Sequence, residues 1–340
     1  MGASENRFDL LRLLFAMVVF IYHGAILTTE GDISVWDHNL ALLAELSVQG
    51  FFITSGALVF GSLERSREIT EYAEKRIRRL YPAYFVVILI PAAIAAALHW
   101  GNAEAMAQVA QYLGVNLIFL NFLQPDLPGF LEGRQVSAVN GALWTLKIEV
   151  MFYIALPFLA WGLSKLGRFW WVGILAFYLG GWFWSVEVAR LDHPLAEQIA
   201  RQLPGQMAYF ASGMALWKLW PIAKARSGIS LIFGSGVLIA SFLVPEMAIM
   251  RAAAMAAIVA GVAFAPGPAF KVAEWGDVSY GIYITHFPIV QGLVALGLFS
   301  MLPLAGKIVV PAALVLVASY ALWWTVERPS LRRDSHYRKA

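Results

Sequence analysis

Long apolar runs alternate with short polar connections along nearly the whole chain. A transmembrane helix needs about 20 mostly apolar residues, and windows of that kind recur throughout. The pattern therefore predicts an all-α, polytopic integral membrane bundle of about ten transmembrane helices. The expected spans cover residues 8–27, 40–60, 83–100, 142–163, 169–186, 205–220, 229–244, 248–265, 278–298 and 303–326.

One further apolar segment, residues 106–122, does not fit this series. It is short, and the polar stretch 124–140 follows it. Its amide side chains are costly in hydrocarbon. We expect the segment to lie at the membrane interface or to re-enter the membrane; the amides are Gln108, Gln111, Asn116 and Asn121.

The distribution of basic residues predicts the orientation of the bundle. Lys and Arg collect in cytoplasmic connections, so each extra crossing would reverse the side of every later loop. With ten spans, both termini are predicted to be cytoplasmic, and the first outer loop carries Glu30, Asp32 and Asp37 without any Lys or Arg. All but six of the 25 Lys and Arg residues then lie inside; the six are Arg134, Lys147, Arg190, Arg201, Arg251 and Lys307.

Composition supports a membrane protein and excludes several chemistries. The chain is 60% hydrophobic and 14% charged, whereas soluble domains are about a quarter charged. We therefore expect one transmembrane domain over residues 1–340, with a short basic cytoplasmic tail over 327–340. The net charge of +3 is explained by topology and does not predict nucleic-acid binding. Zero Cys excludes thiolate nucleophiles and Cys-based metal sites, and no metal is expected.

Two ionisable residues are predicted to lie in the outer halves of their spans. Such residues are costly in a membrane, which makes each a functional hypothesis. The His23 imidazole suits a general base acting on a hydroxyl, or bonds a neighbouring helix. The carboxylate of Glu149, at similar depth, can fix the tautomer of an imidazole, or forms an ion pair with Lys147 or with Arg residues of other helices.

Two other features point to the inner side of the membrane. If the basic segment 72–82 is helical, Arg76 and Arg79 share a face, with Pro82 bounding the turn. Such a pair can clamp phosphate, although topology alone also supplies basic residues here. His286 lies about 12 Å into its span by helical rise. It either lines the same cavity as His23 or stabilises a bend at Pro288.

An ordered set of motifs covers nearly the whole chain, and together they resemble membrane-bound acyltransferase family 3. That family includes bacterial O-acetyltransferases of surface polysaccharides. The motifs that carry the resemblance are Arg7-Phe8-Asp9-Leu10-Leu11-Arg12 with His23, Phe51-Phe52-Ile53-Thr54-Ser55-Gly56, Arg76 and Arg79 with Pro82, Trp144-Thr145-Leu146 with Glu149, residues 279–286, and Glu327-Arg328-Pro329.

The resemblance implies roles for these residues. His23 would be the essential catalytic His, with Glu149, Asp9 and Arg12 in support. Arg76 and Arg79 would bind acyl-CoA, expected to be acetyl-CoA, from the cytoplasm. His286 is expected to belong to the same donor-binding set. Two positions depart from the family pattern: Gln49 replaces an acidic residue, and Lys147 a small or hydroxyl residue. The chain resembles members without an appended esterase-like domain.

The predicted function is transfer of an acyl group to a hydroxyl of an extracytoplasmic or lipid-linked glycan at the bacterial cytoplasmic (inner) membrane. His23 would act as general base or through a transient acyl-imidazole, and the sequence leaves both routes open. Acylation of a small lipophilic acceptor such as a macrolide is the second enzyme hypothesis. A proton-coupled transporter is the alternative from another class, although no internal repeat supports it.

Overall fold

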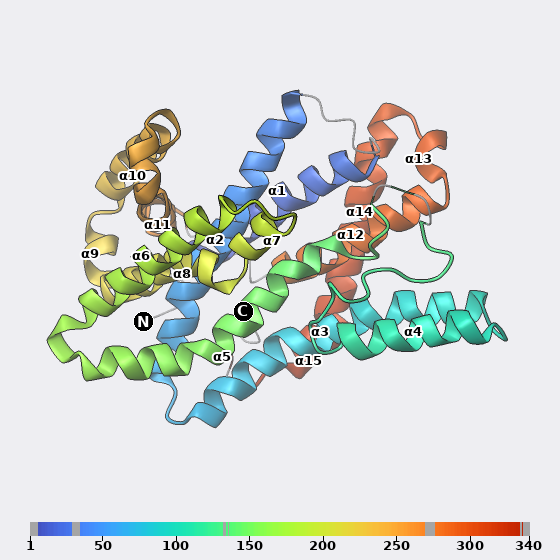
Figure 1. The fold of residues 1–340 in the computed structure, drawn as a ribbon, viewed down its shortest axis with the longest axis horizontal. Helices are drawn as coiled ribbons and strands as arrows, with labels where there is room; N and C mark the ends of the chain where they lie inside the picture. The colour runs from blue at the N-terminus through green and yellow to red at the C-terminus, as the bar shows by residue number, and fades with distance from the viewer. Residues whose placement is uncertain are drawn as a thin grey trace. The chain divides into compact units, whose positions relative to one another are not determined.

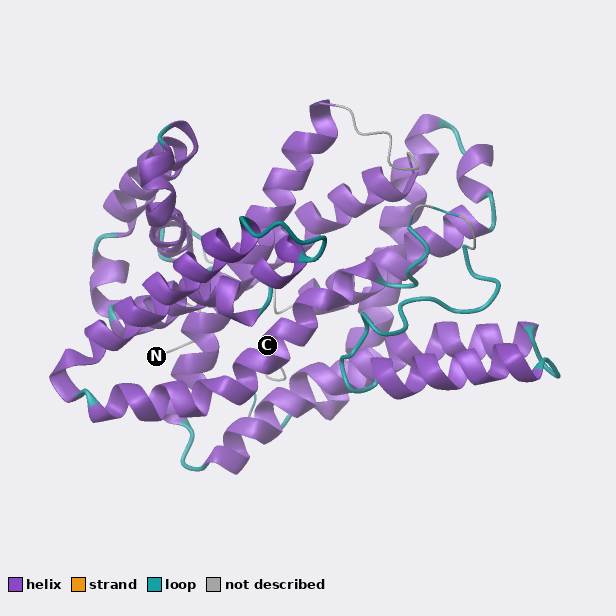
Figure 2. Ribbon diagram, in the orientation of Figure 1, coloured by secondary structure: helices purple, strands orange, loops and turns teal. Residues whose placement is uncertain are grey.

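The structure is a computed structural model that describes residues 6–28, 35–131, 134, 136–268, 276–333 and 335. Helices make up its regular structure, and the described residues form no strand (Figures 1 and 2). Glu30, Asp32, Lys271 and, within the predicted basic tail, residues 334 and 336–340 lie outside the described residues. The prediction of an all-helical protein is confirmed.

The chain folds into two units, each made of discontinuous segments. Unit 1 comprises residues 1–12, 46–73 and 148–271, and unit 2 comprises residues 13–45, 74–147 and 272–340. Four helices contribute residues to both units: α1 (Phe8–Thr28), α2 (Val35–Arg65), α3 (Ile69–Leu98) and α5 (Trp144–Lys165).

Unit 1 is completed by helices that follow α5 along the chain. Helix α6 packs on α8, and α10 packs on α11. Helix α2 approaches α8 closely, because a Cβ atom on Gly56 would lie 2.2 Å from the Phe210 carbonyl oxygen. Small residues permit such backbone contact between membrane helices. The helices are α6 (Trp170–Ala189), α7 (Ala196–Ala200), α8 (Leu203–Lys218), α9 (Trp220–Ala225), α10 (Ser227–Leu243) and α11 (Arg251–Ala263).

Unit 2 is completed by α4 and by the helices near the C-terminus. Figure 1 shows α4 alongside α3, and the Tyr84 hydroxyl of α3 donates to the Asn116 carbonyl oxygen at 2.6 Å. Helix α12 packs on α14. The elements are α4 (Ala103–Asn116), the 3-10 helix η2 (Gly141–Leu143), α12 (Ser279–Ala295), α13 (Leu298–Met301), α14 (Leu304–Leu322), the π-helix η6 (Trp323–Glu327) and α15 (Arg328–Ser330).

The described residues contain 7 helices that are long and apolar enough to cross a membrane. Three expected spans form shorter helices instead, since α8 has 16 residues and α10 and α12 have 17 each. The count of ten spans and the cytoplasmic placement of both termini stay predictions. The spans that qualify are Phe8–Thr28, His38–Arg65, Ile69–Leu98, Gly141–Lys165, Gly167–Ala189, Pro245–Ala263 and Ala305–Ser330.

Two local expectations have definite outcomes. The basic segment is helical, but Pro82 does not bound it, because Pro82 lies inside α3 together with Pro91. That expectation was wrong: membrane helices tolerate Pro where neighbouring groups satisfy the freed backbone carbonyls. In the segment 106–122, helix α4 ends at Asn116 after 14 residues, too few to span a bilayer. Its placement at the interface stays a prediction.

Candidate active site

The two candidate histidines meet in unit 2. The Nδ1 atom of His23, on α1, lies 2.8 Å from the Nε2 atom of His286, on α12. The ring planes are nearly parallel, at an interplanar angle of 11°, with centroids 5.1 Å apart. His286 is fully buried, whereas His23 keeps part of its surface exposed. The structure brings His286 into direct contact with His23, and the two roles considered for His286, lining a shared cavity or stabilising a bend at Pro288, stay predictions.

The partners of His286 fix the proton positions of the pair. The Nδ1 atom of His286 lies 2.9 Å from the Ile282 carbonyl oxygen. A carbonyl oxygen only accepts, so this Nδ1 carries the proton, and the neutral ring presents a lone pair at Nε2. His23 then donates its Nδ1 proton to that lone pair. Its own Nε2 is left unprotonated, as a general base requires.

Aromatic rings hold His23 in place. The Phe287 ring meets the His23 ring edge-on at 5.1 Å, and Tyr22 lies beside it at 5.3 Å. Phe287 directly follows His286 on α12, so one helix supplies both the hydrogen-bond partner and the packing partner of His23. The imidazole therefore has a defined orientation within unit 2.

Glu149 belongs to unit 1, where two hydroxyl groups bind it. Ser55 Oγ donates to Glu149 Oε1 at 3.3 Å, and the Tyr153 hydroxyl forms a short hydrogen bond to the same oxygen. Ser55 comes from the Phe51–Gly56 motif on α2, and Tyr153 lies one helical turn after Glu149 on α5. These contacts orient the carboxylate. Its partnership with His23 stays a prediction.

Asp9 and Arg12 lie at the beginning of α1 in unit 1. Asp9 precedes His23 by fourteen residues on this helix, which corresponds to about 21 Å along the axis. Neither side chain can reach the imidazole over such a length of helix. Any support that they give to His23 would therefore be indirect.

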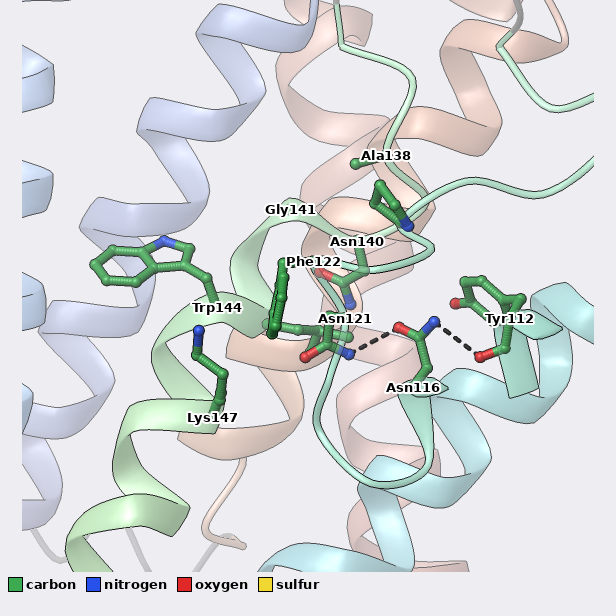
Figure 3. Close-up of a pocket in the computed structure, with 11 residues that line it drawn as sticks. Tyr112, Asn116, Asn121, Phe122, Ala138, Asn140, Gly141, Trp144 and Lys147 are labelled. Carbon is green, nitrogen blue, oxygen red and sulfur yellow. Dashed lines mark hydrogen bonds between the residues drawn. The ribbon is translucent and has the colours of Figure 1, made fainter. Parts of the chain in front are cut away.

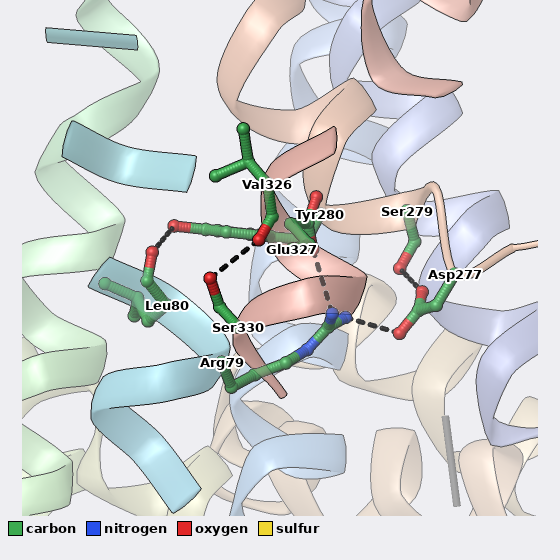
Figure 4. Close-up of polar contacts among 8 residues, drawn as sticks. All are labelled: Arg79, Leu80, Asp277, Ser279, Tyr280, Val326, Glu327 and Ser330. Atoms are coloured by element: carbon green, nitrogen blue, oxygen red, sulfur yellow. Dashed lines mark hydrogen bonds and ion pairs between the residues drawn. The ribbon is translucent and has the colours of Figure 1, made fainter. Parts of the chain in front are cut away.

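Arg79 sits at the centre of a buried ion-pair cluster in unit 2 (Figure 4). Its guanidinium donates to Glu327 at 2.9 Å and also pairs with Asp277. The Ser279 hydroxyl binds the other oxygen of Asp277 at 2.7 Å. The Arg79 side chain is 11% exposed, and the two carboxylates are 2% and 1% exposed. This arrangement ties α3 to the segment before α12 and to the π-helix.

The ion-pair cluster bears on the predicted phosphate clamp. Arg76 precedes Arg79 by three residues on α3, so the two share a face as expected. However, two carboxylates already occupy the guanidinium of Arg79, and a phosphate would have to displace one of them. The ion pairs show that Arg79 connects the surrounding helices, and binding of the acyl donor by Arg76 and Arg79 stays a prediction.

A cavity of about 130 Å³, which the sequence analysis did not single out, lies in unit 2 (Figure 3). Its wall comes from α4, from the connection after α4, and from the first turns of η2 and α5. Aromatic rings, three Asn side chains and Lys147 line it. The only sequence signals for this cavity were the amides of the segment 106–122 and the unusual Lys147.

The described residues contain no group of three or more His, Cys, Asp or Glu residues that could hold a metal ion.

Comparison with known proteins identifies the family. A family model described as "Acyltransferase domain" (Acyl_transf_3) matches residues 5–328. The chain belongs to the acyltransferase 3 family. It is therefore an acyltransferase, with an acyl donor and an acceptor as substrates, and its apolar helices make it a multi-pass membrane protein.

Three known proteins are similar to the chain over most of their length. The chain is 26% identical to "O-acetyl transferase" of Shigella phage Sf6, covering 98% of each protein. It is 25% identical to "Nodulation protein 10" of Rhizobium leguminosarum bv. viciae, covering 97% of this chain and 94% of that protein. "Acyltransferase MdmB" of Streptomyces mycarofaciens is 24% identical over 81% of this chain and 68% of that protein. No solved structure matches the chain significantly.

Proposed function

We propose that this acyltransferase moves an acyl group, an acetyl group in the first instance, from cytoplasmic acyl-CoA to a hydroxyl of an extracytoplasmic or lipid-linked glycan. The hydrogen-bond series from the Ile282 carbonyl through His286 to His23 carries the proposal, because it leaves the His23 Nε2 lone pair ready to accept a proton. The relative named "O-acetyl transferase" supports an oxygen acceptor.

The transfer step balances with these groups. His23 Nε2 takes the proton of the acceptor hydroxyl as its oxygen attacks the thioester carbonyl carbon. The carbon–sulfur bond then breaks, and the departing CoA sulfur receives that proton from His23. Throughout, His286 Nε2 accepts a hydrogen bond from His23 Nδ1–H and so stabilises the imidazolium. A free Nε2 also permits the acyl-imidazole route.

The proposal also includes a side of the membrane for each substrate. We propose that the chain crosses the bacterial cytoplasmic membrane ten times, with both termini in the cytoplasm and α4 at the outer membrane interface. The phosphates of CoA cannot cheaply enter hydrocarbon, so they stay at the inner surface near Arg76, and only the pantetheine arm and thioester enter the bundle. Release of CoA from acetyl-CoA by the purified protein tests this function, and vesicle flux without CoA release would favour a transporter.

His286 is predicted to be a positioning residue for His23. In His286→Gln, the amide oxygen can still accept a hydrogen bond from His23 Nδ1–H. In His286→Leu this acceptor is lost, and the His23 imidazole is free to adopt the other tautomer. We expect His286→Leu to lower kcat by at least about 10-fold with little change in the donor KM. The Gln variant should recover much of the loss. Equal kcat values in the two folded variants would contradict this role.

Glu149→Gln is expected to lower kcat more than it weakens donor binding, because a neutral amide cannot stabilise an imidazolium. The amide oxygen still accepts from Ser55 and Tyr153, so the local structure should persist. Steady-state kinetics with acetyl-CoA measures the effect. Normal turnover combined with a lower unfolding temperature would assign Glu149 to structure alone.

A further inference from the structure

The cavity in unit 2 lies beside the histidine pair. Gly141 is part of its wall, and a Cβ atom on Gly141 would lie 2.7 Å from the tip of the Phe287 ring. That ring in turn meets the His23 ring edge-on, with centroids 5.1 Å apart. A single side chain thus separates the cavity wall from the predicted base.

The same connection is fixed to the helix that carries His286. Asn140 Nδ2 donates to the Ile284 carbonyl oxygen at 2.8 Å, and Asn140 Oδ1 accepts from the backbone of η2. Further along α12, Gln291 Nε2 donates to the carbonyl oxygens of Val136 and Ala138 at 3.0 and 3.1 Å. The cavity and His286 are therefore held together by α12.

The lining leaves one polar atom in need of a ligand. Asn121 Nδ2 donates to Asn116 Oδ1 at 2.7 Å and to the Tyr84 hydroxyl at 2.9 Å. The Oδ1 atom of Asn121 is buried and has no hydrogen-bond partner among the described residues. Buried acceptors are nearly always satisfied, so a donor such as a ligand hydroxyl suits this position.

Lys147 gives the cavity a positive charge. Its ammonium lies 4.7 Å from the centroid of the Phe122 ring, and no carboxylate within the described ranges pairs with it. Figure 3 shows this ammonium beside the Phe122 ring and below Trp144 in the view. A cation without a counter-charge in a small cavity attracts an anionic group.

The size of the cavity limits what enters it. An apolar cavity of about 150 Å³ holds one benzene molecule, so a volume of about 130 Å³ takes no more than one six-membered ring, and further groups of the same molecule would extend beyond it. Aromatic side chains can cover the apolar face of such a ring while a few polar groups fix its orientation. Burial raises the pKa of Tyr112, at the far end of the lining, so its hydroxyl keeps its proton and stays a potential donor.

We propose that this cavity is the acceptor site, and that it binds one sugar ring with an anionic group of the same molecule against Lys147. The role of the cavity as an acceptor site rests on the proposed function, whereas the binding test below does not require acyl transfer. The anionic group is a carboxylate on the sugar or a phosphate attached to it. Asn121 Oδ1 would accept a hydrogen bond from one ring hydroxyl, and another hydroxyl would have to extend past the Phe287 ring to reach His23.

Cysteine labelling tests the site without requiring turnover, because the chain contains no Cys. Ala138→Cys places a reporter thiol in the lining, and Glu104→Cys, on the exposed first turn of α4, is the matched control. The measured quantity is the ratio of the labelling rate with an anionic methanethiosulfonate reagent to the rate with a cationic one. This ratio should be several-fold higher for the Ala138→Cys protein than for the Glu104→Cys protein. Adding Lys147→Gln should abolish that preference, and adding Lys147→Arg should retain it.

Sugar protection then identifies the ligand class. Methyl β-D-glucuronoside or glucose 1-phosphate should slow labelling at position 138 but not at position 104, and methyl β-D-glucoside should protect less. Protection by the first probe indicates a sugar carboxylate, and protection by the second a sugar phosphate. The acceptor site is overturned if neither anionic sugar protects, or if folded Lys147→Gln keeps the reagent preference. Protection without any CoA release would instead contradict the proposed function alone.

Discussion

Arg79→Ala is expected to destabilise the protein by about 3–5 kcal/mol, because removing one partner of a buried ion pair leaves uncompensated charge behind. Here two carboxylates, Asp277 and Glu327, would lose their shared cation, and both are almost completely buried. The aromatic rings of Tyr280 and Trp323, each 5.8 Å from the guanidinium carbon, would lose a cation contact as well. Thermal unfolding of the detergent-purified variant measures the effect.

Arg78→Ala provides the matched control on the same helix. Arg78 pairs with Glu74 one turn away, and both side chains are exposed by more than 40%. Exposed pairs of this kind contribute at most about 1 kcal/mol. If Arg79→Ala and Arg78→Ala are equally stable, the ion-pair cluster does not hold unit 2 together. A stable Arg79→Ala variant that has lost only CoA binding would assign Arg79 to the donor.

His23→Ala is expected to lower acyl transfer by about 10²–10⁴-fold, the range that a positioned general base contributes. Donor affinity should stay close to that of the wild type, because the proposed contact of the CoA phosphates is Arg76 on α3 and not His23. The rate of thiol release from acetyl-CoA measures turnover with a thiol-reactive dye. The absence of Cys from the chain removes any background from protein thiols.

His99→Ala is the control for removal of an imidazole. His99 follows the end of α3, its Nδ1 atom lies 3.0 Å from the Ala95 carbonyl oxygen, and its ring lies against Gly129, so these contacts of His99 do not include His23. This variant should retain turnover. A folded His23→Ala protein with the rate of His99→Ala would remove His23 from the reaction.

The sequence predicted the helical class and the residues of the histidine pair, but not their pairing. An imidazole within an apolar run is unusual enough to attract attention by itself. The bond between His23 and His286 joins positions 263 residues apart. Only the packing of α1 against α12 creates it, and no local pattern in the sequence encodes that packing.

The same limit explains what was missed around Arg79. Its spacing from Arg76 was readable, whereas its partners Asp277 and Glu327 lie 198 and 248 residues away. A basic residue that looks available for phosphate in the sequence is thus enclosed by acids in the fold. The prediction at Pro82 was wrong for a different reason. The rule that Pro ends a helix holds for soluble proteins and is weaker in a membrane bundle.

Transfer of an acyl group to oxygen by His23 is tested most directly by the acylated product. Membranes containing wild-type protein or His23→Ala can be incubated with acetyl-labelled acetyl-CoA and an acceptor-containing envelope extract. We expect labelled product whose acyl bond is cleaved by hydroxylamine, as an ester is, with wild-type membranes and almost none with His23→Ala. Equal labelling in the two, or CoA release by the wild type without any acylated product, would contradict this role of His23.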